Sequence, residues 1–438
     1  MGKKKWRTGR DTFLYVSNLP EGAVESIRKY GEGLGKKFKV AVIYNQKIQI
    51  IGDNAKKRGA DIIIPADFSS PSAIQKALVP YRDKLLGTTA RGDISVGYFR
   101  KVIPHLPEMR TPNAESLLWS VNKIDMRKRF FAYDKSITPK FAIAKDSTQK
   151  TIDRIVKRVN FPCVVKPPDL AESILVAICF HEEELQAALK RTFAKVRSIY
   201  KKKMIQTPPR VLVEQFMEGN MYSVDAYVNS RGVVHFTPMV YIKTGREIGF
   251  DDFFGYMQLT PTNLKTQSIK DAHVVARKAV KALGMRSTSA HIELMRTEDG
   301  WKIIEVGARI GGFRVEMYKL SYGFDHGLND LIHRVPNKIK VPKRKKGYTA
   351  AMKFFAKEEG ELVKLVGAKK AKSLASFHSI DVKKKVGATL KYAKHGGVSV
   401  FNIMLFNKER SKLLADIRRL EKMIIIETKK VPKKSAKK

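Results

Sequence analysis

The sequence predicts a multidomain protein of the α/β and α+β classes. Apolar strand-like segments alternate with helix-permissive segments near the N-terminus, which is typical of a small parallel-sheet domain. Strand-like segments with hairpin-like connections follow, and a basic, proline-containing segment precedes a last strand-and-helix pattern. These observations predict an N-terminal α/β domain at 1–112, a central domain at 113–340, a small C-terminal α+β domain at 341–427 and a basic disordered tail at 428–438.

The individual elements follow from apolar runs and from the residues that separate them. In the N-terminal domain, strands are predicted at 13–17, 39–44 and 61–65, with helices at 22–36 and 53–59. The central domain is predicted to contain a helix at 113–134, strands at 161–166, 174–180, 210–217, 222–228 and 233–241, and helices at 182–200 and 270–283. After a linker at 335–347, strands at 350–355 and 399–405 and a helix at 408–420 are expected. No G-x-G-x-x-G follows the first strand, so a dinucleotide site is unsupported.

A hairpin with two glutamates is the most informative part of the chain. Segments 289–295 and 301–309 have strand composition, and an Asp-Gly pair typical of a hairpin turn lies between them. Glu293 and Glu305 should therefore lie nearly opposite each other. The alternation of side chains along a strand places Arg309 on the same face as Glu305.

Two carboxylates and an arginine on one face favour a site for magnesium and phosphate. Carboxylate oxygens are ligands that Mg²⁺ prefers, and an arginine can bind a phosphoryl or carboxylate oxygen pair with two parallel hydrogen bonds. Gly311 and Gly312 follow, and glycines permit close backbone approach to a ligand. A solvated hairpin face with a cross-strand ion pair is the alternative. His291, on the same strand face as Glu293, either orients the site or is a packed core histidine.

Charge and cysteine content limit the classes of function. The formal net charge of the 438 residues is +43, which favours acidic partners, nucleotides or nucleic acid, although a lysine-rich background explains scattered basic residues equally well. The two cysteines, Cys163 and Cys179, lie in apolar runs and are predicted to be buried thiols in a reducing compartment. No apolar run approaches the ~18 residues of a membrane span, so the expected location is the cytoplasm and no membrane partner is expected.

Further candidate residues lie at the ends of strands. Lys166 ends an apolar strand before two prolines, and a buried lysine at a strand end is uncommon unless it meets an anion. Lys123 is a second candidate cation, with a surface helix position as the alternative. The segment 214–219 leaves an apolar strand and ends at glycine, so its backbone could read an adenine edge and Glu214 could accept from the adenine amino group. An ordinary edge strand explains the same pattern.

Together these residues resemble the ATP-grasp ligases. The resemblance rests on Lys166 in FPCVVKP, on VLVEQFMEG, and on SAHIEL with IIEVGARIGG, and it is greatest for the branch that joins amino acids through an acyl phosphate. It covers almost the whole chain and is firm over 120–320. It implies an ATP-grasp architecture in which Lys123 and Lys166 contact ATP phosphates and Glu293 and Glu305 hold Mg²⁺, with Mn²⁺ as a substitute.

The same resemblance assigns the remaining site residues. Adenine would lie against the residues that leave the strand, which are Glu214, Gln215, Phe216 and Met217. Ser173 would belong to the loop that covers the phosphates, and Asp225 would bind ribose where the usual acidic position is Met221. Arg309 would hold the substrate carboxylate or the acyl phosphate, with Lys243 and Arg246 as further anion contacts.

The implied reaction transfers the γ-phosphoryl group of ATP to a carboxylate, and an amine then attacks the acyl phosphate, releasing ADP and phosphate. The expected partners are a small-molecule carboxylate and amine, an acidic polymer or acidic protein, and a second copy of the chain. Ser173 is not followed by the flexible glycine of the family, and Met221 is not acidic. These departures and the net charge leave open a catalytically reduced protein that binds nucleic acid or another polyanion, with an affinity that falls steeply with salt.

Overall fold

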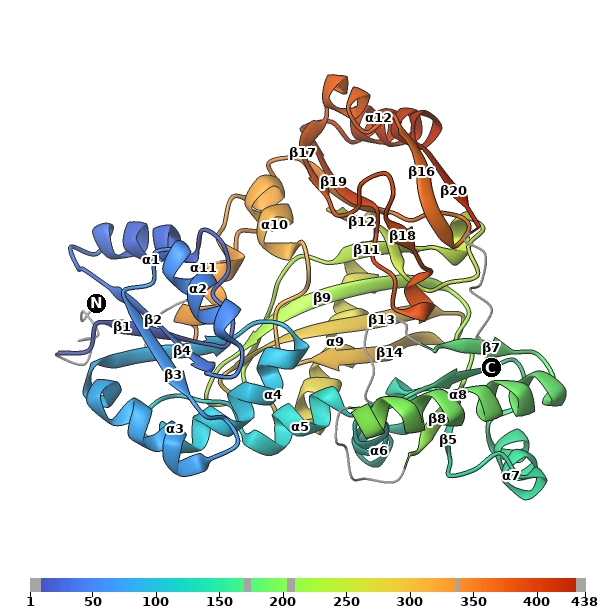
Figure 1. Ribbon diagram of the computed structural model, residues 1–438, viewed down its shortest axis with the longest axis horizontal. Coiled ribbons are helices and arrows are strands. Elements are labelled where there is room, and N and C mark those ends of the chain that lie inside the picture. The colour runs from blue at the N-terminus through green and yellow to red at the C-terminus, as the bar shows by residue number, and fades with distance from the viewer. Residues whose placement is uncertain (1–8, 169–174, 203–208, 336–338, 340, 431–438) are drawn as a thin grey trace, which may run out of the picture.

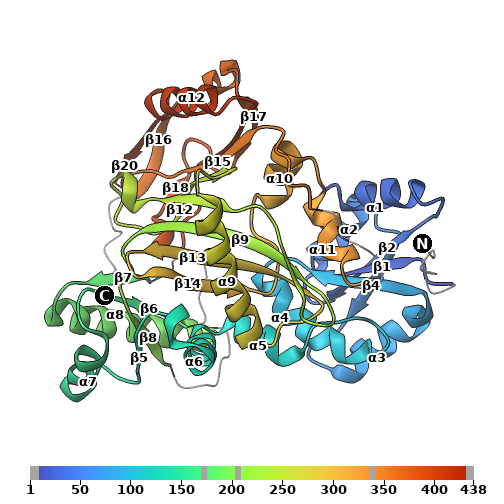
Figure 2. The same ribbon diagram turned by 180° about the vertical axis from the view of Figure 1, so that it is seen from behind.

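The computed structural model describes residues 9–168, 175–202, 209–335, 339 and 341–430 (Figure 1). Within these residues the strands form four sheets. The N-terminal domain lies at one side of a long central sheet, and the small sheet formed by residues 141–215 lies at the other side. Strands from the C-terminal region extend the central sheet at its top, as both views show (Figures 1 and 2).

The N-terminal sheet is parallel, with strand order β3-β2-β1-β4, as predicted. Every residue of β1 is buried, because helices cover both faces of the sheet. The fourth strand, β4, was not predicted. The elements are β1 (Thr12–Val16), α1 (Ala23–Glu32), β2 (Lys39–Asn45), α2 (Gln49–Lys57), β3 (Ile62–Ala66), α3 (Pro71–Leu78), η1 (Val79–Lys84), β4 (Leu85–Ala90), α4 (Asp93–Val102) and η2 (Ile103–His105).

The single helix predicted over 113–134 is two helices, α5 (Ala114–Val121) and α6 (Lys123–Tyr133). Asn122 separates them because its backbone is extended, with φ −106° and ψ 106°. Its side-chain oxygen accepts hydrogen bonds from the first free backbone amides of α6, so it acts as the N-cap. Lys123 is therefore the first residue of a new helix, and its backbone amide donates to the carbonyl of Pro168 at 3.1 Å.

A small antiparallel sheet follows, with strand order β5-β8-β6-β7. Two helices, α7 and α8, pack on one face and form its hydrophobic core. Cys163 and Cys179 are cross-strand neighbours on β6 and β7 and are free, buried thiols, as predicted. The elements are η3 (Lys135–Ile137), β5 (Phe141–Ala144), α7 (Gln149–Val159), β6 (Cys163–Lys166), β7 (Ala177–Cys179), α8 (Glu182–Lys202) and β8 (Val211–Gln215).

The central sheet has the strand path β14-β13-β9-β11-β12-β15-β19-β17, with β10 beside β9. The first five strands of this path belong to the central region, and the last three come from the C-terminal region. Strand β12 precedes the domain boundary predicted at residues 340–341, and β15 follows it. The two strands pair, so one continuous sheet contains strands from both predicted domains. The central elements are β9 (Asn220–Val228), β10 (Val234–Phe236), β11 (Val240–Thr244), η4 (Arg246–Ile248), β12 (Gly255–Thr260), α9 (Thr266–Ala282), β13 (Thr288–Thr297) and β14 (Gly300–Gly307).

The C-terminal region adds a three-stranded sheet of order β18-β16-β20 above the central sheet. Its core combines residues of α12 with residues of β15 and β19, so the region packs as one unit with the end of the central sheet. The elements are β15 (Tyr348–Phe354), β16 (Gly360–Val366), η5 (Lys370–Ser373), β17 (Phe377–Val382), β18 (Thr389–Leu390), η6 (Ala393–His395), β19 (Phe401–Asn407), α12 (Arg410–Met423) and β20 (Ile425–Lys429).

Two helices that were not predicted, α10 (Arg314–Tyr322) and α11 (His326–Ile332), follow the glutamate hairpin. Helix α11 lies beside the N-terminal domain (Figure 2), and its Leu331 is part of the core under that sheet. Val335 is also buried there, so the linker predicted over 335–347 begins later than expected. Val335 is apolar and packs in this core, so it belongs to the folded domain and not to a solvated linker.

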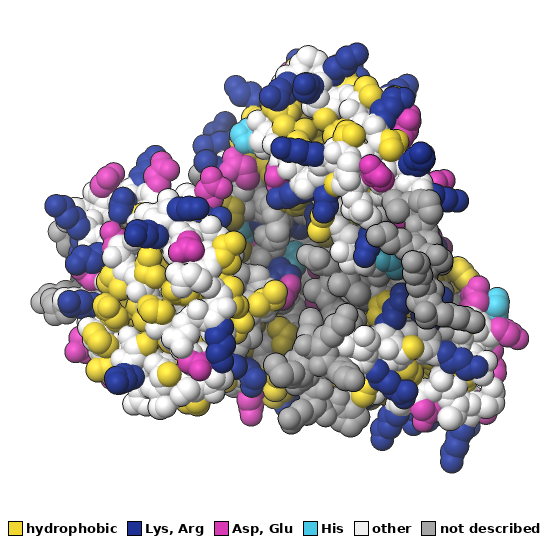
Figure 3. Space-filling view, viewed as in Figure 1, with side chains coloured by type: hydrophobic (Ala, Val, Ile, Leu, Met, Phe, Trp, Pro, Cys, Tyr) yellow, Lys and Arg dark blue, Asp and Glu magenta, His cyan; other side chains and the backbone are white. Residues whose placement is uncertain are grey.

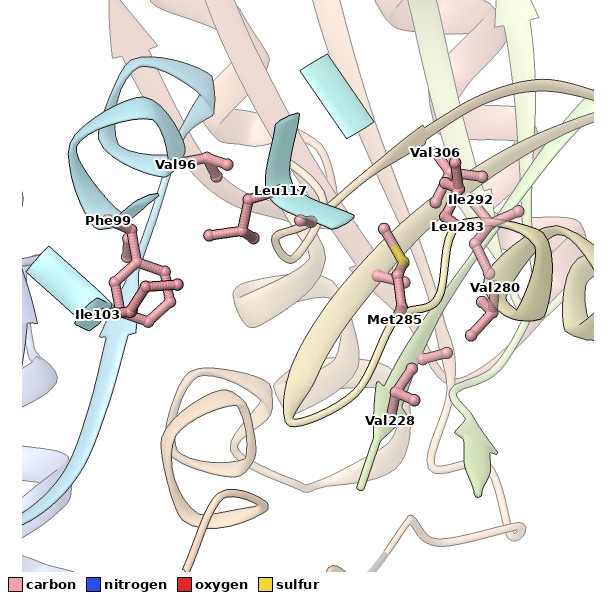
Figure 4. Close-up of a cluster of buried hydrophobic side chains, with 14 of the residues drawn as sticks. Val96, Phe99, Ile103, Leu117, Val228, Val280, Leu283, Met285, Ile292 and Val306 are labelled. Atoms are coloured by element: carbon pink, nitrogen blue, oxygen red, sulfur yellow. The ribbon is translucent and has the colours of Figure 1, made fainter. Parts of the chain in front are cut away.

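The N-terminal domain and the central sheet share one hydrophobic core (Figure 4). Val96 and Phe99 of α4 reach it from the N-terminal domain, and Leu117 of α5 lies between them and the central sheet. Ile292 and Val306 of the hairpin belong to the same cluster. Because interiors are closely packed, this core holds α4 and the hairpin in a defined relation. No helix in the described part of the chain is both long and apolar enough for a transmembrane helix.

Candidate active site

The glutamate hairpin forms as predicted. Strands β13 and β14 pair antiparallel, and Glu293 lies directly opposite Glu305. The register shifts just after Glu293, so the hairpin carries a bulge beside this pair. Both side chains are partly exposed, at 28% for Glu293 and 35% for Glu305. The two carboxylates can therefore meet a ligand from solvent while the backbone fixes their spacing.

Basic side chains from two other elements reach the same place. Lys123, at the start of α6, places its Nζ 3.4 Å from a carboxylate oxygen of Glu305. Arg309 follows β14 and binds Asp93 of α4 with two hydrogen bonds, from Nε to Oδ1 at 2.6 Å and from Nη2 to Oδ2 at 2.8 Å. Burial alone would raise the pKa of Asp93, but the hydrogen bonds and charge of Arg309 outweigh it and the pKa is lowered.

His291 connects Glu293 to a buried carboxylate. Its Nε2 lies 3.3 Å from Glu293, and its Nδ1 lies 2.6 Å from Asp225 of β9. The second oxygen of Asp225 lies 2.7 Å from Nε2 of His326 and accepts from the Gly311 amide at 2.7 Å. Burial would lower the pKa of His291, but Asp225 and then Glu293 raise it. His291 is therefore a packed histidine that also contacts the hairpin carboxylate.

The two glycines after Arg309 have different roles. A Cβ on Gly311 would lie 2.5 Å from the Nδ1 of His291, so this glycine is required by the packing of the histidine. That is a structural reason, whereas close ligand approach was expected from the sequence. A Cβ on Gly312 would meet no atom within 4 Å, so open space adjoins this residue. The open space beside Gly312 leaves room for the close ligand approach that the sequence predicts.

Lys166 and Glu214 belong to a buried ion cluster. Glu214 of β8 is 1% exposed, and its Oε2 lies 2.7 Å from the Nζ of Lys166. Its other oxygen accepts from Nε of Arg127 on α6, and the remaining nitrogens of Arg127 donate to the carbonyls of Ile303 at 3.0 Å and Ile304 at 2.7 Å. Burial would raise the pKa of Glu214, but the two cations hold it at about 2. This cluster ties the small sheet to β14.

This arrangement differs from the adenine contact expected of Glu214. Its two oxygens already accept from Arg127 and Lys166, so the side chain is engaged inside the protein rather than open to a base. Gln215, Phe216 and Met217 do leave the strand as expected, but the Phe216 amide donates to the carbonyl of Pro162 at 3.0 Å. Gln215 is exposed at the strand end.

Asp225 does not occupy a position suited to ribose. It is 0% exposed, and both of its oxygens accept hydrogen bonds within the protein. Its pKa is far below the usual range: burial would raise it, but His291 and His326 outweigh that effect. We therefore do not retain the ribose role. Ser173, the expected residue of the phosphate-covering loop, lies outside the described residues.

Lys243 and Arg246 lie beyond the hairpin, on and just after β11. Lys243 is half-buried at the pairing of β11 with β12. Arg246 binds the exposed Asp251 at 3.4 Å and lies over the ring of Phe253 at 5.4 Å from its centre. The structure thus places both near one exposed loop, and their role as anion contacts stays a proposal.

The face shown in Figure 3 is hollowed between the N-terminal domain and the C-terminal strands. Basic, acidic and histidine side chains lie in the hollow. On the same face, Lys and Arg side chains are spread over all lobes rather than gathered into one patch. The described part of this face therefore shows no single basic patch.

Sequence reasoning missed Arg127 and Asp93. Arg127 is 2% exposed, yet it lies in a basic run, KIDMRKRFF, that is typical of a solvated helix. Asp93 follows a glycine at the start of a helix and looks like an ordinary acidic residue of a first turn. Both gain their importance from partners more than 80 residues away, so no local pattern could have identified them.

The overall fold matches solved structures along nearly its whole length. The L-amino acid ligase from Bacillus licheniformis superposes with a TM-score of 0.79 over 97% of this chain and 100% of that chain, at 18% identity. The ATP-grasp domain family matches residues 159–316. This chain has the ATP-grasp fold. The predicted ATP-grasp architecture is therefore confirmed, and residues of the match include Lys166, Glu214 and both hairpin glutamates.

Several curated proteins that are similar to this chain are named as ligases. Alanine–anticapsin ligase of Bacillus subtilis (strain 168) is 24% identical over 217 residues, covering 47% of this chain and 45% of the relative. D-alanine–D-alanine ligase of Flavobacterium johnsoniae is 23% identical over 211 residues, covering 46% of this chain and 58% of the relative. The chain thus spans about half the length of the curated relatives that it matches.

Proposed function

We propose that this ATP-grasp protein is an ADP-forming ligase that joins a carboxylate to an amine. The observation that carries the proposal is the cross-strand pair Glu293 and Glu305, with Lys123 and Arg309 beside it. The names of the relatives, which are amino-acid ligases, agree with this reaction class. The reaction class is proposed here without a particular carboxylate or amine.

The residues present fit ATP and magnesium. Across the described part of the chain, no group of three or more His, Cys, Asp or Glu side chains is placed to hold a metal on its own. Two hairpin carboxylates suit Mg²⁺ held jointly by protein and phosphate oxygens, which is the usual arrangement for this ion. When bound, Mg²⁺ would neutralise phosphate charge, and Mn²⁺ would fit the same oxygen ligands.

The chain's own residues then bind and orient the reactants. Glu293 and Glu305 would hold the metal, and His291 fixes the orientation of Glu293 through Asp225. Lys123 would contact a phosphate, because its ammonium already lies beside Glu305 at the end of the hairpin. Arg309 would bind the carboxylate that receives the phosphoryl group. Positioning and charge neutralisation of this kind supply most of the catalysis in phosphoryl transfer.

The buried cluster of Lys166, Glu214 and Arg127 would form the wall of the nucleotide site. Lys166 is part-exposed at 17%, so its ammonium can contact a phosphate while it remains bound to Glu214. Gln215, Phe216 and Met217 would meet the base through backbone and side chain. Lys243 and Arg246 would contribute further anion contacts from β11 and the residues that follow it.

A polyanion-binding protein without catalysis is the second candidate, and the net charge of +43 favours it. Such binding would weaken steeply as salt rises, because phosphate contacts release counterions. Acidic substrates would combine the two candidates, since the positive field would raise their encounter rate. The paired glutamates, by contrast, would repel a polyanion that brought no metal ion.

The test is ADP release with Mg-ATP across amino acids, dipeptides and acidic polymers. The parent should release ADP with at least one carboxylate substrate, and Glu305→Ala should lower the rate by at least about 100-fold, because a metal ligand is lost. Glu298→Ala changes an exposed glutamate in the turn of the same hairpin and should keep the parent rate. Equal rates for Glu305→Ala and the parent would refute the metal assignment.

A further inference from the structure

Arg314, the first residue of α10, is a buried cation with no carboxylate partner in the described part of the chain. The residue is 1% exposed. Its guanidinium donates to the side-chain oxygen of Gln258, to the hydroxyl of Ser223 at 2.6 Å and to the carbonyl of Gly312 at 3.2 Å, and all of these acceptors are uncharged. The Nε atom is buried and has no hydrogen-bond partner among the described residues.

The stability of the fold does not explain a cation at this position. Buried charges are normally paired, because an ion that leaves water without a counter-charge is costly. A cation at the start of a helix also opposes the helix dipole, which favours negative charge there. Other basic side chains of the site do contact carboxylates, as Lys123 contacts Glu305. The folded protein therefore leaves the charge of Arg314 uncompensated, and a bound anion would supply the missing negative charge.

Arg314 lies on the same face of the central sheet as the paired glutamates. Glu293 lies opposite Glu305 on one side and opposite Ser223 of β9 on the other. Directly paired residues of antiparallel strands point to the same face of a sheet, with Cβ atoms about 4.5–5.5 Å apart. Because Nη2 of Arg314 donates to Ser223, the guanidinium lies one strand away from Glu293 along this row.

The charge of Arg314 acts on Glu293. Burial would raise the pKa of Glu293, but His291 and then Arg309 and Arg314 lower it. The same positive field opposes a free divalent cation, and it is permanent because an arginine does not lose its proton in proteins. Phosphate oxygens reverse this balance, since their negative charge offsets both the guanidinium and the metal ion.

We propose that Arg314 makes metal binding by Glu293 and Glu305 depend on the phosphates of the nucleotide. This inference rests on the proposed ligase function and adds a positioning residue to it. Without a nucleotide, the buried guanidinium repels the metal ion, and the two carboxylates bind it weakly. With a nucleotide, the phosphates supply the negative charge that the protein lacks. Glu293 and Glu305 thereby bind a metal ion mainly when a nucleotide accompanies it.

The experiment measures metal binding rather than turnover. Mn²⁺ is the probe, and electron paramagnetic resonance reports the free ion with and without an ATP analogue whose β,γ-bridging oxygen is replaced by a methylene group. A titration without protein gives the share of the ion that the analogue holds by itself. The parent should bind Mn²⁺ at least about tenfold more tightly with the analogue than without it.

Variants of Arg314 separate its charge from its hydrogen bonds. Without the analogue, Arg314→Gln should bind Mn²⁺ at least about tenfold more tightly than the parent, because the repelling charge is lost. The ratio of the affinities with and without the analogue should fall accordingly. Arg314→Lys keeps the charge and should keep the parent's ratio. Lys319→Gln removes an exposed cation from the same helix and should also keep that ratio.

A change at Gln258 tests the same charge without removing Arg314. Gln258→Glu places a carboxylate where the guanidinium already donates, so Mn²⁺ binding without the analogue should again tighten at least about tenfold. The melting temperature should be no lower than that of the parent, because the buried cation gains a counter-charge. Gln258→Met removes the acceptor without adding charge and should not tighten metal binding. A purely structural role predicts the opposite sign, since a disturbed site would bind the metal more weakly.

The outcomes distinguish this inference from the proposed function. A folded Arg314→Gln variant, or a Gln258→Glu variant, that binds Mn²⁺ no more tightly than the parent without the analogue would overturn the inference alone. Gln258→Glu decides the matter if Arg314→Gln does not fold. A parent that binds no Mn²⁺ even with the analogue, or a Glu305→Ala variant that binds it as the parent does, would instead refute the metal assignment, and the inference with it.

Discussion

Two pairs of carboxylates in this protein differ in how completely the protein itself satisfies them. Glu214 and Asp225 are buried, and every carboxylate oxygen accepts a hydrogen bond from a side chain or the backbone. Glu293 and Glu305 are partly exposed, and they contact His291 at 3.3 Å and Lys123 at 3.4 Å, respectively. The first pair holds the fold together, and the second keeps binding capacity for a ligand.

The comparison predicts that Glu214→Ala destabilises the protein strongly in unfolding experiments and that Glu305→Ala has little effect. Glu214→Ala leaves Arg127 and Lys166 without their shared counter-charge, so the free energy of unfolding should fall by about 3–5 kcal/mol. Glu305→Ala removes a partly exposed ion pair and should change it by less than about 1 kcal/mol. Urea unfolding measures both. Similar losses for the two variants would erase the distinction.

The pH dependence of stability sharpens the comparison further. Glu214 has a pKa of about 2 in the folded protein against an ordinary value of 4.5. A carboxyl whose pKa is lowered by folding stabilises the protein above its ordinary pKa, and the contribution disappears as the pH falls toward the folded value. Between pH 4.5 and 2, the parent should lose roughly 3 kcal/mol more than Glu214→Gln. Urea unfolding across this range that gave parallel curves would contradict the role of Glu214.

Arg127→Lys should have a smaller effect, because it keeps the charge beside Glu214. The lysine cannot also donate to the carbonyls of Ile303 and Ile304, so a loss of about 1–2 kcal/mol in unfolding free energy is expected. The exposed Arg100→Lys serves as the control and should be neutral. A higher KM for ATP in Arg127→Lys would connect the cluster to the nucleotide site, whereas equal stability of the two variants would show that the carbonyl contacts contribute little.

The sequence predicted the features that depend on local pattern. Alternation and an Asp-Gly turn were enough to place Glu293 opposite Glu305, because strand pairing across a short turn is set by neighbouring residues. The parallel N-terminal sheet followed from alternating strands and helices, because a helix that crosses over between two strands brings them together in parallel. The motifs that resemble the ATP-grasp ligases lie in or next to strands β6, β8, β13 and β14, which the local pattern also predicted.

Features that depend on distant partners were missed or misassigned. Glu214 and Asp225 were expected to contact the nucleotide, but cations and histidines from other elements occupy their oxygens. The helix expected over 113–134 was broken by the capping side chain of Asn122, whose preference for a cap competes with its place in a helix. The Asp93 and Arg309 contact joins residues 216 positions apart, beyond any local pattern.

The pairing of β12 with β15 bears on how the polypeptide would respond to a cut in its basic connecting segment. Residues on either side of Lys343 and Arg344 contribute neighbouring strands to one sheet, held by backbone hydrogen bonds from Met257 to Thr260. A trypsin-like protease that cleaved there would give two fragments on a denaturing gel but a single particle in native size-exclusion chromatography. The C-terminal lobe is therefore expected to stay attached to the central region after such a cut, as long as the protein stays folded.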